Sequence, residues 1–386
     1  MGSVNSYSSA SGKRYRVRYR TPEGKQTDKR GFATKREAVE FLASVETRKS
    51  TGDYIANRDS RILVRDWSEV WLDSLINLKP TTKSGYQYSL SKHILPRWGD
   101  SQIGDISHAD IQRWVGELTR TLAPSSVRQV YQVLRSMLRF AVRDRRIVRN
   151  PADDVNLPRI KKTQRGYLSH QQVHQLAAEA GPWGDLLIVL SYTGLRWGEL
   201  AGLRVRNLDL AHRRITVVES VSEVGGTLVW GSPKNDQPRV VKYPKFLSAS
   251  LATRAAGKQP DQLVFTSWLG APLRNNNFRR RVFNPALART IEADPTFPVV
   301  TPHDLRHTAA SLSVSAGANV KAIQRMLGHA SAAMTLDVYA DLFDDDLDTV
   351  SDALEIAAER HFRDARWIHP ATPRTGPTTD PYGPGI

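Results

Sequence analysis

The spacing of the apolar residues changes along this chain, and each change predicts a different kind of structure. Residues 15–20 alternate between arginine and an aromatic or aliphatic side chain, and a period of two is typical of a β-strand. From about Ile62 onward, the apolar residues recur at helical spacing instead. Because 386 residues exceed what one hydrophobic core usually spans, we predict a multidomain α+β protein.

The segment 1–57 predicts a small β-sheet with one helix. The strand at 15–20 is followed by a turn at 22–24 and by a second, more polar strand. Thr34 and Glu37 have the spacing of a capping box, so a helix is expected to begin there. One face of the first strand carries four candidate DNA-binding side chains, which are Arg14, Arg16, Arg18 and Arg20.

The segment 62–158 predicts a helical domain. Asp66 and Ser107 are each followed three residues later by a carboxylate, which is the pattern of a helix N-terminus. Two further helices are expected around residues 82–94 and 125–145, and the second of them has a continuous apolar stripe. The tryptophans at helical spacing are expected to form the core of this bundle.

The segment 166–345 is predicted to be mainly α-helical, with a small antiparallel sheet. Alternating apolar residues predict three strands, at 214–221, 227–230 and 239–243. Gly225-Gly226 lies between the first two strands and predicts a hairpin turn. Lys234 lies on the loop between the last two strands, where a mobile side chain could reach a reacting group.

Four short motifs in this segment together suggest phosphoryl-transfer chemistry. Arg196 follows Thr-Gly-Leu, Arg306 follows His-Asp-Leu, and Lys234 follows a proline in the predicted loop. Tyr339 stands ten residues after His329, which ends a Leu-Gly-His triplet. Each motif alone is common by chance, but their order and separation together favour one site.

These residue types match the needs of a phosphodiester under attack. Guanidinium groups stabilise negative charge on the phosphate oxygens with planar, bidentate donors. A lysine in cationic surroundings gives up its proton more readily and can protonate a leaving hydroxyl. A tyrosine phenolate can attack phosphorus and hold the DNA as an ester, which conserves the bond energy and makes ATP unnecessary.

The motifs resemble those of the tyrosine recombinase (phage integrase) family, whose members cut and rejoin DNA through a 3′-phosphotyrosyl intermediate. The resemblance implies an arm-type DNA-binding domain at 1–57, a core-binding domain at 62–158 and a catalytic domain at 166–345. It implies a site made of Arg196 and Arg306 as the phosphate clamp, Lys234 as the acid, His303 as base or proton relay, His329 as a further phosphate donor, Glu199 as support and Tyr339 as the nucleophile. His307 is assigned a structural role.

The same resemblance implies the partners of the chain. These are double-stranded DNA at core-type and arm-type attachment sites, three further copies of the chain in a tetramer on DNA, and accessory proteins such as a host DNA-bending factor and an excisionase. No metal or cofactor is expected, because no cluster of carboxylates or histidines has ligand spacing around the motifs.

The composition independently favours a nucleic-acid partner. The 55 lysines and arginines outnumber the 39 acidic residues, and a net charge of +16 favours polyanions through phosphate neutralisation. The chain has no cysteine, which excludes disulfides and agrees with a reducing bacterial cytoplasm. Its longest apolar run, 186–190, is far too short to span a membrane.

The C-terminal segment 346–386 predicts an acidic helix and a disordered tail. Leu347, Val350, Leu354 and Ala357 recur at helical spacing, with acidic residues on the other faces. In related recombinases such a helix docks on a neighbouring subunit; packing on its own domain is the alternative. Beyond about His369, the proline, glycine and threonine content predicts disorder.

Other classes of protein also fit parts of this pattern. A sequence-specific DNA-binding protein without catalytic activity would explain the charge and the architecture, but not the motif order. A type IB topoisomerase uses similar chemistry, yet it needs no second DNA-binding domain. A chromosome-dimer or plasmid-resolving recombinase would normally lack the segment 1–57. The sequence therefore favours the integrase of a temperate phage or an integrative element.

Overall fold

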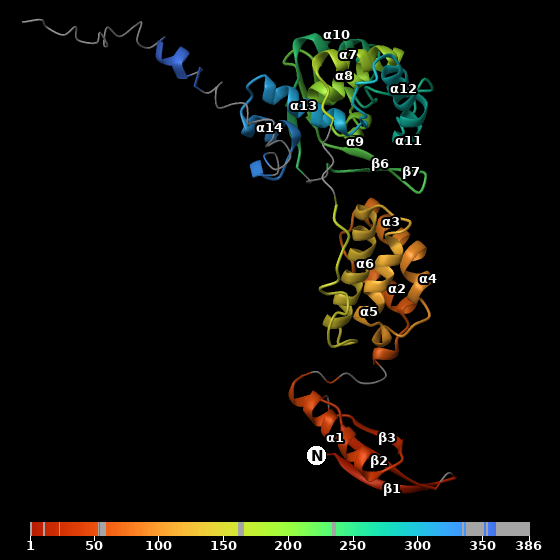
Figure 1. The fold of residues 1–386 in the computed structure, drawn as a ribbon. Coiled ribbons are helices and arrows are strands. Elements are labelled where there is room, and N and C mark those ends of the chain that lie inside the picture. The colour runs from red at the N-terminus through yellow and green to blue at the C-terminus, as the bar shows by residue number, and fades with distance from the viewer. Residues whose placement is uncertain are drawn as a thin grey trace, which may run out of the picture. The chain divides into compact units, whose positions relative to one another are not determined.

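The computed structural model describes residues 2–10, 12–22, 24–52, 54, 59–160, 166–233, 237–333, 336, 351–352 and 354–359. The chain divides into two compact units, residues 1–164 with 223–229 and residues 165–222 with 230–386. Both helices and small antiparallel sheets are present (Figure 1), which confirms the predicted α+β class. In the described part of the chain, no helix has the length and apolar character needed to cross a membrane.

The N-terminal part is a three-stranded antiparallel sheet covered by one helix. The elements are β1 (Ser3–Ser9), β2 (Gly12–Arg20), β3 (Gln26–Phe32) and α1 (Lys35–Ser50), with β2 in the centre. The backbone N–H of Glu37 donates to Oγ1 of Thr34 at 3.2 Å, so the predicted helix start is correct. Strand β1 was not predicted, because its serine-rich sequence has no apolar alternation.

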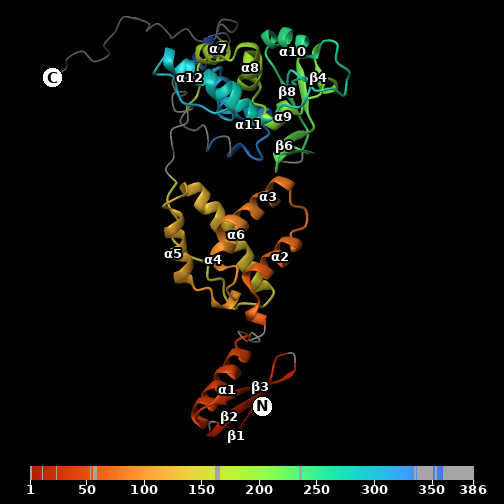
Figure 2. The same ribbon diagram turned by 90° about the vertical axis from the view of Figure 1, so that its right-hand side faces the viewer.

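Helix α1 lies across one face of this sheet, as Figure 2 shows. Val17 is fully buried on that face, and the rings of Tyr19 and Phe41 meet edge to face with their centroids 6.1 Å apart. Side chains alternate between the two faces of a strand. The four arginines at even positions of β2 therefore lie on the face opposite α1.

The helical part of the first unit follows the sequence prediction closely. Its elements are η1 (Asp59–Arg61), α2 (Val64–Ser74), α3 (Pro80–Ser89), η2 (Leu90–Ile94), α4 (Leu95–Trp98), η3 (Ile103–Asp105), α5 (His108–Leu118) and α6 (Pro124–Arg143). The backbone N–H of Asp110 donates to Ser107 at 3.2 Å, which confirms the predicted cap of α5. Asp66 was predicted to cap α2, but the helix begins two residues earlier and Leu63 occupies the cap.

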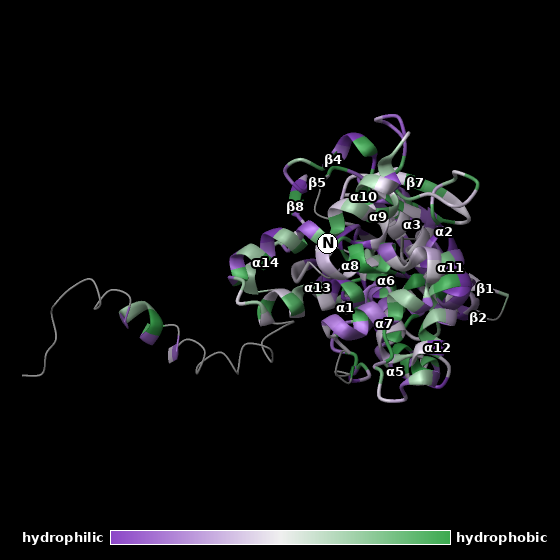
Figure 3. Ribbon diagram, turned by 90° about the horizontal axis from the view of Figure 1, so that it is seen from above, coloured by the Kyte–Doolittle hydropathy of each residue, from purple (hydrophilic) through white to green (hydrophobic). Residues whose placement is uncertain are grey.

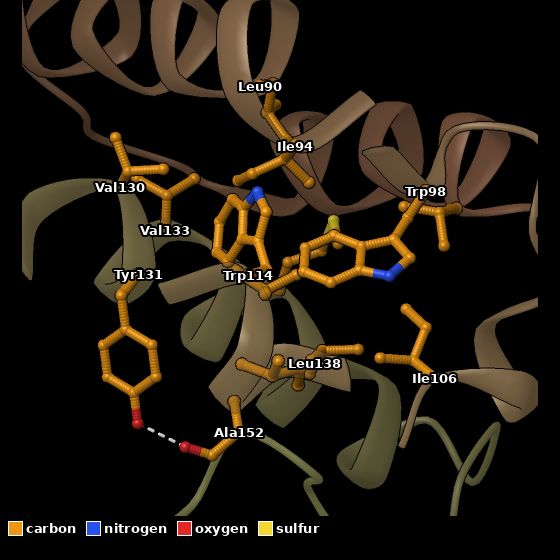
Figure 4. Close-up of a cluster of buried hydrophobic side chains, with 14 of the residues drawn as sticks. Leu90, Ile94, Trp98, Ile106, Trp114, Val130, Tyr131, Val133, Leu138 and Ala152 are labelled. Carbon is orange, nitrogen blue, oxygen red and sulfur yellow. Dashed lines mark hydrogen bonds between the residues drawn. The ribbon is translucent and has the colours of Figure 1, made fainter. Parts of the chain in front are cut away.

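Tryptophans form the core of this bundle, as predicted. Trp98 and Trp114 meet edge to face, with ring centroids 4.6 Å apart (Figure 4). Tyr131 is buried on α6, and its hydroxyl donates to the carbonyl oxygen of Ala152. A buried tyrosine needs such a partner for its hydroxyl. This bond fastens the chain that follows α6 onto the bundle.

The second unit is built around one apolar helix. Its helices are α7 (His170–Glu179), η4 (Gly181–Trp183), α8 (Gly184–Thr193), α9 (Trp197–Ala201), η5 (Val205–Asn207), η6 (Lys245–Leu247), α10 (Ser248–Ala255), α11 (Asn275–Phe278), η7 (Arg279–Phe283), α12 (Asn284–Ala293), α13 (Asp304–Ser315) and α14 (Val320–Leu327). Every residue of α8 is buried or half-buried, and α8 packs against α7 and α13. A Cβ at Gly184 would collide with the carbonyl oxygen of Ala177, so this glycine permits the close approach of α7 and α8.

The strands that follow α9 in the sequence form two sheets. Strands β4 (Leu208–Asp209), β5 (Arg214–Val217) and β8 (Arg239–Lys242) make one antiparallel sheet, and β6 (Ser220–Val224) pairs with β7 (Thr227–Gly231). The turn at Gly225-Gly226 is confirmed, with φ values of 56° and 80°. The single strand predicted at 214–221 was wrong, because the chain changes from one sheet to the other after Val217.

Helix α14 is strongly amphipathic, with apolar and polar residues on different sides (Figure 3). Ile323 and Leu327 are buried against Ala310 and Val314 of α13. Helix α14 ends at Leu327 and is capped by Gly328, which has a φ of 65° and is therefore in the left-handed region that favours glycine. The Leu-Gly-His motif is thus the C-terminus of a helix that packs on α13.

Candidate active site

Arg306 is buried where the ends of two helices meet. Its side chain comes from α13, and the residue is only 3% exposed. Its Nη1 donates to the carbonyl oxygen of Gly194 at 2.5 Å, and its Nη2 donates to that of Leu327. Gly194 follows the C-terminus of α8 and Leu327 ends α14. The last carbonyls of a helix lack partners within it and carry partial negative charge, so a guanidinium is well suited to this position.

Glycines at both helix ends make this arrangement possible. Gly194 has a φ of 63°, and a Cβ there would lie 2.6 Å from a methyl carbon of Leu327. The Thr-Gly-Leu motif before Arg196 and the Leu-Gly-His motif are therefore in direct contact, as the predicted site requires. Gly328, after the end of α14, also has a positive φ. Neither Gly194 nor Gly328 could be replaced without strain in the backbone or collision with a neighbour.

Arg196 and Glu199 form the second part of the site. Arg196 caps the N-terminus of α9, and its side chain is 22% exposed. Its backbone N–H and its Nη1 donate to the two oxygens of Glu199 at 2.8 and 2.9 Å. Glu199 is therefore in contact with the predicted catalytic arginine, as the supporting role assigned to it requires.

Arg239 is a site residue that the sequence analysis missed. Its Nη1 and Nη2 donate to the two oxygens of Glu199 at 2.8 and 2.6 Å, and its Nε donates to the carbonyl oxygen of Met326 at 3.1 Å. A signal was present in the sequence: Arg239 is in phase with the buried Val241 of β8 and therefore lies on the inward face of its strand. An inward arginine requires a buried anion.

The carboxylate of Glu199 remains ionised in these surroundings. Burial by itself raises its pKa, but hydrogen bonds and positive charge from Arg239, together with those from Arg196, outweigh burial and hold the pKa below its usual range. The charge of Glu199 is therefore matched by two guanidinium groups.

His329 is held in the neutral form. Burial lowers its pKa to about 4, and the positive charges of Arg306, Arg196 and Arg239 act in the same direction. The three arginines influence His329 because all of them lie near it. A neutral imidazole can still donate one N–H bond to a phosphate oxygen.

This pKa predicts how stability depends on pH. The pKa of His329 is about 4 in the folded chain and about 6.5 when unperturbed. Between these values the unfolded chain binds a proton that the folded chain excludes, so stability falls as the pH falls from about 6.5 to about 4. We expect the loss of melting temperature between about pH 7.5 and about pH 5 to be smaller in His329→Gln than in the wild type. Equal losses in the two proteins would contradict this assignment.

His303 stands at the N-terminus of α13, one turn before Arg306. Its ring meets that of His307 edge to face, with centroids 5.1 Å apart and planes at 89°. His307 therefore lies beside the predicted base or proton relay. The two histidines are at positions i and i+4, which share one side of a helix. The structural role assigned to His307 stays a prediction.

Two predicted catalytic residues, Lys234 and Tyr339, lie outside the described residues. In the sequence, Lys234 follows Pro233 and precedes Arg239. Tyr339 follows the end of α14. Within the described ranges, no group of three or more His, Cys, Asp or Glu side chains could hold a metal ion.

The sheet of the N-terminal part carries the predicted basic face. In the antiparallel pairing, Arg18 is opposite Asp28 and Arg16 is opposite Arg30. A hydrogen bond from Arg30 holds the pKa of Asp28 below its usual value, with smaller contributions from Arg18 and Arg16. Arg30 therefore adds a fifth arginine to the four predicted on this face.

Three family models match the chain. The phage integrase family matches residues 167–345, the phage integrase N-terminal SAM-like domain matches residues 63–119, and an arm DNA-binding domain matches residues 7–49. Among the relatives, an integrase of Streptomyces ambofaciens is 28% identical over 340 residues, which cover 82% of this chain and 86% of that protein. The integrase of Mycobacterium phage D29 is 26% identical over 287 residues, covering 72% and 74% of the two chains.

Solved structures share the fold. The Tn1549 transposon integrase in complex with a circular intermediate DNA superposes with a TM-score of 0.65 at 21% identity, over 72% of this chain and 95% of that chain. A lambda integrase tetramer bound to a Holliday junction gives a TM-score of 0.55 at 18% identity, over 85% and 96%. The family models and the integrase relatives identify a DNA strand-breaking and rejoining enzyme. The chain belongs to the phage integrase family of tyrosine recombinases, and its activity serves the integration of phage or mobile-element DNA.

Proposed function

We propose that this integrase cleaves attachment-site DNA through a 3′-phosphotyrosyl intermediate and uses the same chemistry for integration and excision. The phenolate oxygen of Tyr339 attacks the scissile phosphorus, and the bond to the 5′ oxygen breaks. Lys234 supplies the proton that the departing 5′ oxygen takes up. Rejoining reverses these steps, because the 5′ hydroxyl of a partner strand attacks the ester and releases Tyr339.

One observation carries the proposal: Arg196, Arg306 and a neutral His329 lie around one buried arginine–carboxylate cluster. Arg196 and Arg306 stabilise the charge that develops on the phosphate oxygens. His329 donates a further hydrogen bond, and His303 serves as base or proton relay. The preorganisation of Arg196 and Arg306 by backbone and carboxylate partners supports these roles.

The direct test is trapping of the covalent intermediate on a nicked attachment-site duplex. When the fragment downstream of the cleaved bond diffuses away, the reverse reaction is blocked and a protein–DNA adduct accumulates. We expect an adduct that resists SDS and migrates more slowly than the free protein. Specific DNA binding without any adduct would favour the alternative function, that of a DNA-binding protein without catalytic activity.

We further propose a division of labour along the chain. Residues 1–57 bind arm-type sites through Arg14, Arg16, Arg18 and Arg20, residues 62–158 bind core-type sites and residues 166–345 cleave. The segment 346–386 supplies a helix that docks on a neighbouring subunit of a tetramer; most of it lies outside the described residues. The tetrameric relative on a Holliday junction supports this assembly. A host DNA-bending factor and an excisionase complete the complex in the bacterial cytoplasm.

A fragment beginning at residue 58 tests the arm-binding role. It lacks the arginine face of β2 and is expected to lose affinity for a distal arm-type site by about tenfold or more, because fewer phosphate contacts remain. It should bind and cleave core-type sites as the full chain does. Band-shift titrations at one salt concentration measure both affinities. Equal affinity of fragment and full chain for every attachment-region segment would refute a separate arm-binding domain.

A further inference from the structure

Both oxygens of Glu199 are fully used in hydrogen bonds. Oε1 accepts from Nη1 of Arg196 and Nη1 of Arg239, while Oε2 accepts from the backbone N–H of Arg196 and Nη2 of Arg239. The side chain of Glu199 is 0% exposed. A buried carboxylate with four donors is a fixed anion, so Glu199 is not available as a proton acceptor.

Arg239 connects this carboxylate to the end of α14. Its Nε donates to the carbonyl oxygen of Met326, one of the last carbonyls of that helix. A Cβ at Gly328 would lie 2.8 Å from Cδ of Arg239, so the glycine of the Leu-Gly-His motif also makes room for this arginine. Arg239 is 11% exposed on its side chain and is more enclosed than Arg196.

The two arginines share the carboxylate unequally. Arg239 binds it through a parallel pair of N–H donors, which is the stronger, planar geometry for an arginine and a carboxylate. The guanidinium of Arg196 binds it through Nη1. Without Arg239, each oxygen of Glu199 would lose one of its two donors, and the carboxylate would be free to form the same parallel pair with the guanidinium of Arg196.

We propose that Arg239 is a positioning residue for DNA cleavage. By occupying Glu199 in a bidentate pair, it prevents the carboxylate from closing onto Arg196 and keeps the guanidinium of Arg196 available to the scissile phosphate. This inference rests on the proposed function, because it assumes that Arg196 contacts the phosphate during cleavage.

The test compares Arg239→Met with the double variant Arg239→Met/Glu199→Gln in the full chain. Single-turnover adduct formation on the nicked attachment-site duplex is expected to slow about 100-fold in Arg239→Met, with unchanged affinity for DNA. The double variant should recover to within about tenfold of the wild type, because a neutral amide has no charge with which to hold Arg196. A purely structural role would also be relieved when both partners of the buried pair are removed. The rates are therefore compared well below the melting temperature of each variant, where a residue that served only packing would leave Arg239→Met at the wild-type rate.

Two controls make the comparison decisive. Arg289→Met removes an arginine of another ion pair, in which Nε lies 2.8 Å from Glu179, and should cleave as the wild type does. Arg239→Lys keeps the charge without the planar pair of donors, so it should slow cleavage about tenfold. This variant still tests the inference if Arg239→Met does not fold. Thermal melting identifies the folded variants.

The outcomes separate the inference from the proposed function. If the wild type forms no adduct, the proposed function is overturned, and the inference with it. If the wild type forms the adduct but the double variant is no faster than Arg239→Met, the inference alone is overturned. Cleavage by Arg239→Lys at the wild-type rate would also overturn it.

Discussion

Tyr339→Phe is expected to bind attachment-site DNA with the affinity of the wild type and to form no covalent adduct. The substitution removes only the hydroxyl that would attack phosphorus, and phenylalanine has no nucleophilic atom to replace it. On the nicked attachment-site duplex, an adduct that resists SDS should appear with the wild type and not with this variant. The expected effect is a complete loss rather than a slower rate, because the arginines cannot themselves form the ester.

The control for this experiment is another tyrosine in the second unit. Tyr192→Phe removes a hydroxyl that lies 2.7 Å from Nδ1 of His170 and should leave adduct formation intact. If Tyr339→Phe still becomes attached to DNA, the nucleophile is a different residue. The fold and the arginine cluster would then remain, but the assignment from the motif would be wrong.

Arg306→Met should lose both cleavage and stability. Removal of one group that stabilises developing charge typically costs about 100- to 1,000-fold in rate. The same change leaves the buried carbonyl oxygens of Gly194 and Leu327 without their donor, and each such group costs about 1–3 kcal/mol. Adduct formation is measured well below the melting temperature, so that the two effects can be separated.

A lysine at this position distinguishes charge from geometry. Arg306→Lys keeps the positive charge, but a single ammonium group does not reproduce the planar fork that reaches both carbonyls. Its rate and its melting temperature are expected to lie between those of the wild type and of Arg306→Met. A methionine variant that melts and cleaves as the wild type does would remove Arg306 from the site.

Local signals in the sequence predicted much of this fold. The caps at Thr34 and Ser107, the long helix α6 and the turn at Gly225-Gly226 depend on neighbouring residues, and all of them are found in the structure. Features that depend on distant partners were missed. Strand β1 exists because it pairs with β2 along its whole length, and its own composition gives no strand pattern.

The prediction of the site from the sequence has the same limit: contacts between distant residues were missed. The motifs identified Arg196, Glu199, Arg306 and His329, and the structure brings their segments together. Arg196 bonds to Glu199, and Arg306 bonds to the carbonyl oxygens of Gly194 and Leu327, which precede Arg196 and His329 in their motifs. Arg239 was missed because its role depends on a bond to Glu199, forty residues away along the chain. Spacing within a motif cannot report such a contact. An inward-facing arginine in a short strand would have been the useful clue.

The two carbonyls bound by Arg306 also determine where this protein could be recombined with a relative to make a hybrid enzyme. A crossover placed between α13 and α14 would join an arginine from one parent to a helix end from the other. Buried groups tolerate little mismatch, so even a small change in the path of α14 would separate Arg306 from one of its acceptors. The stretch from α8 to Gly328 should therefore be transferred as one block, with crossovers placed before residue 166.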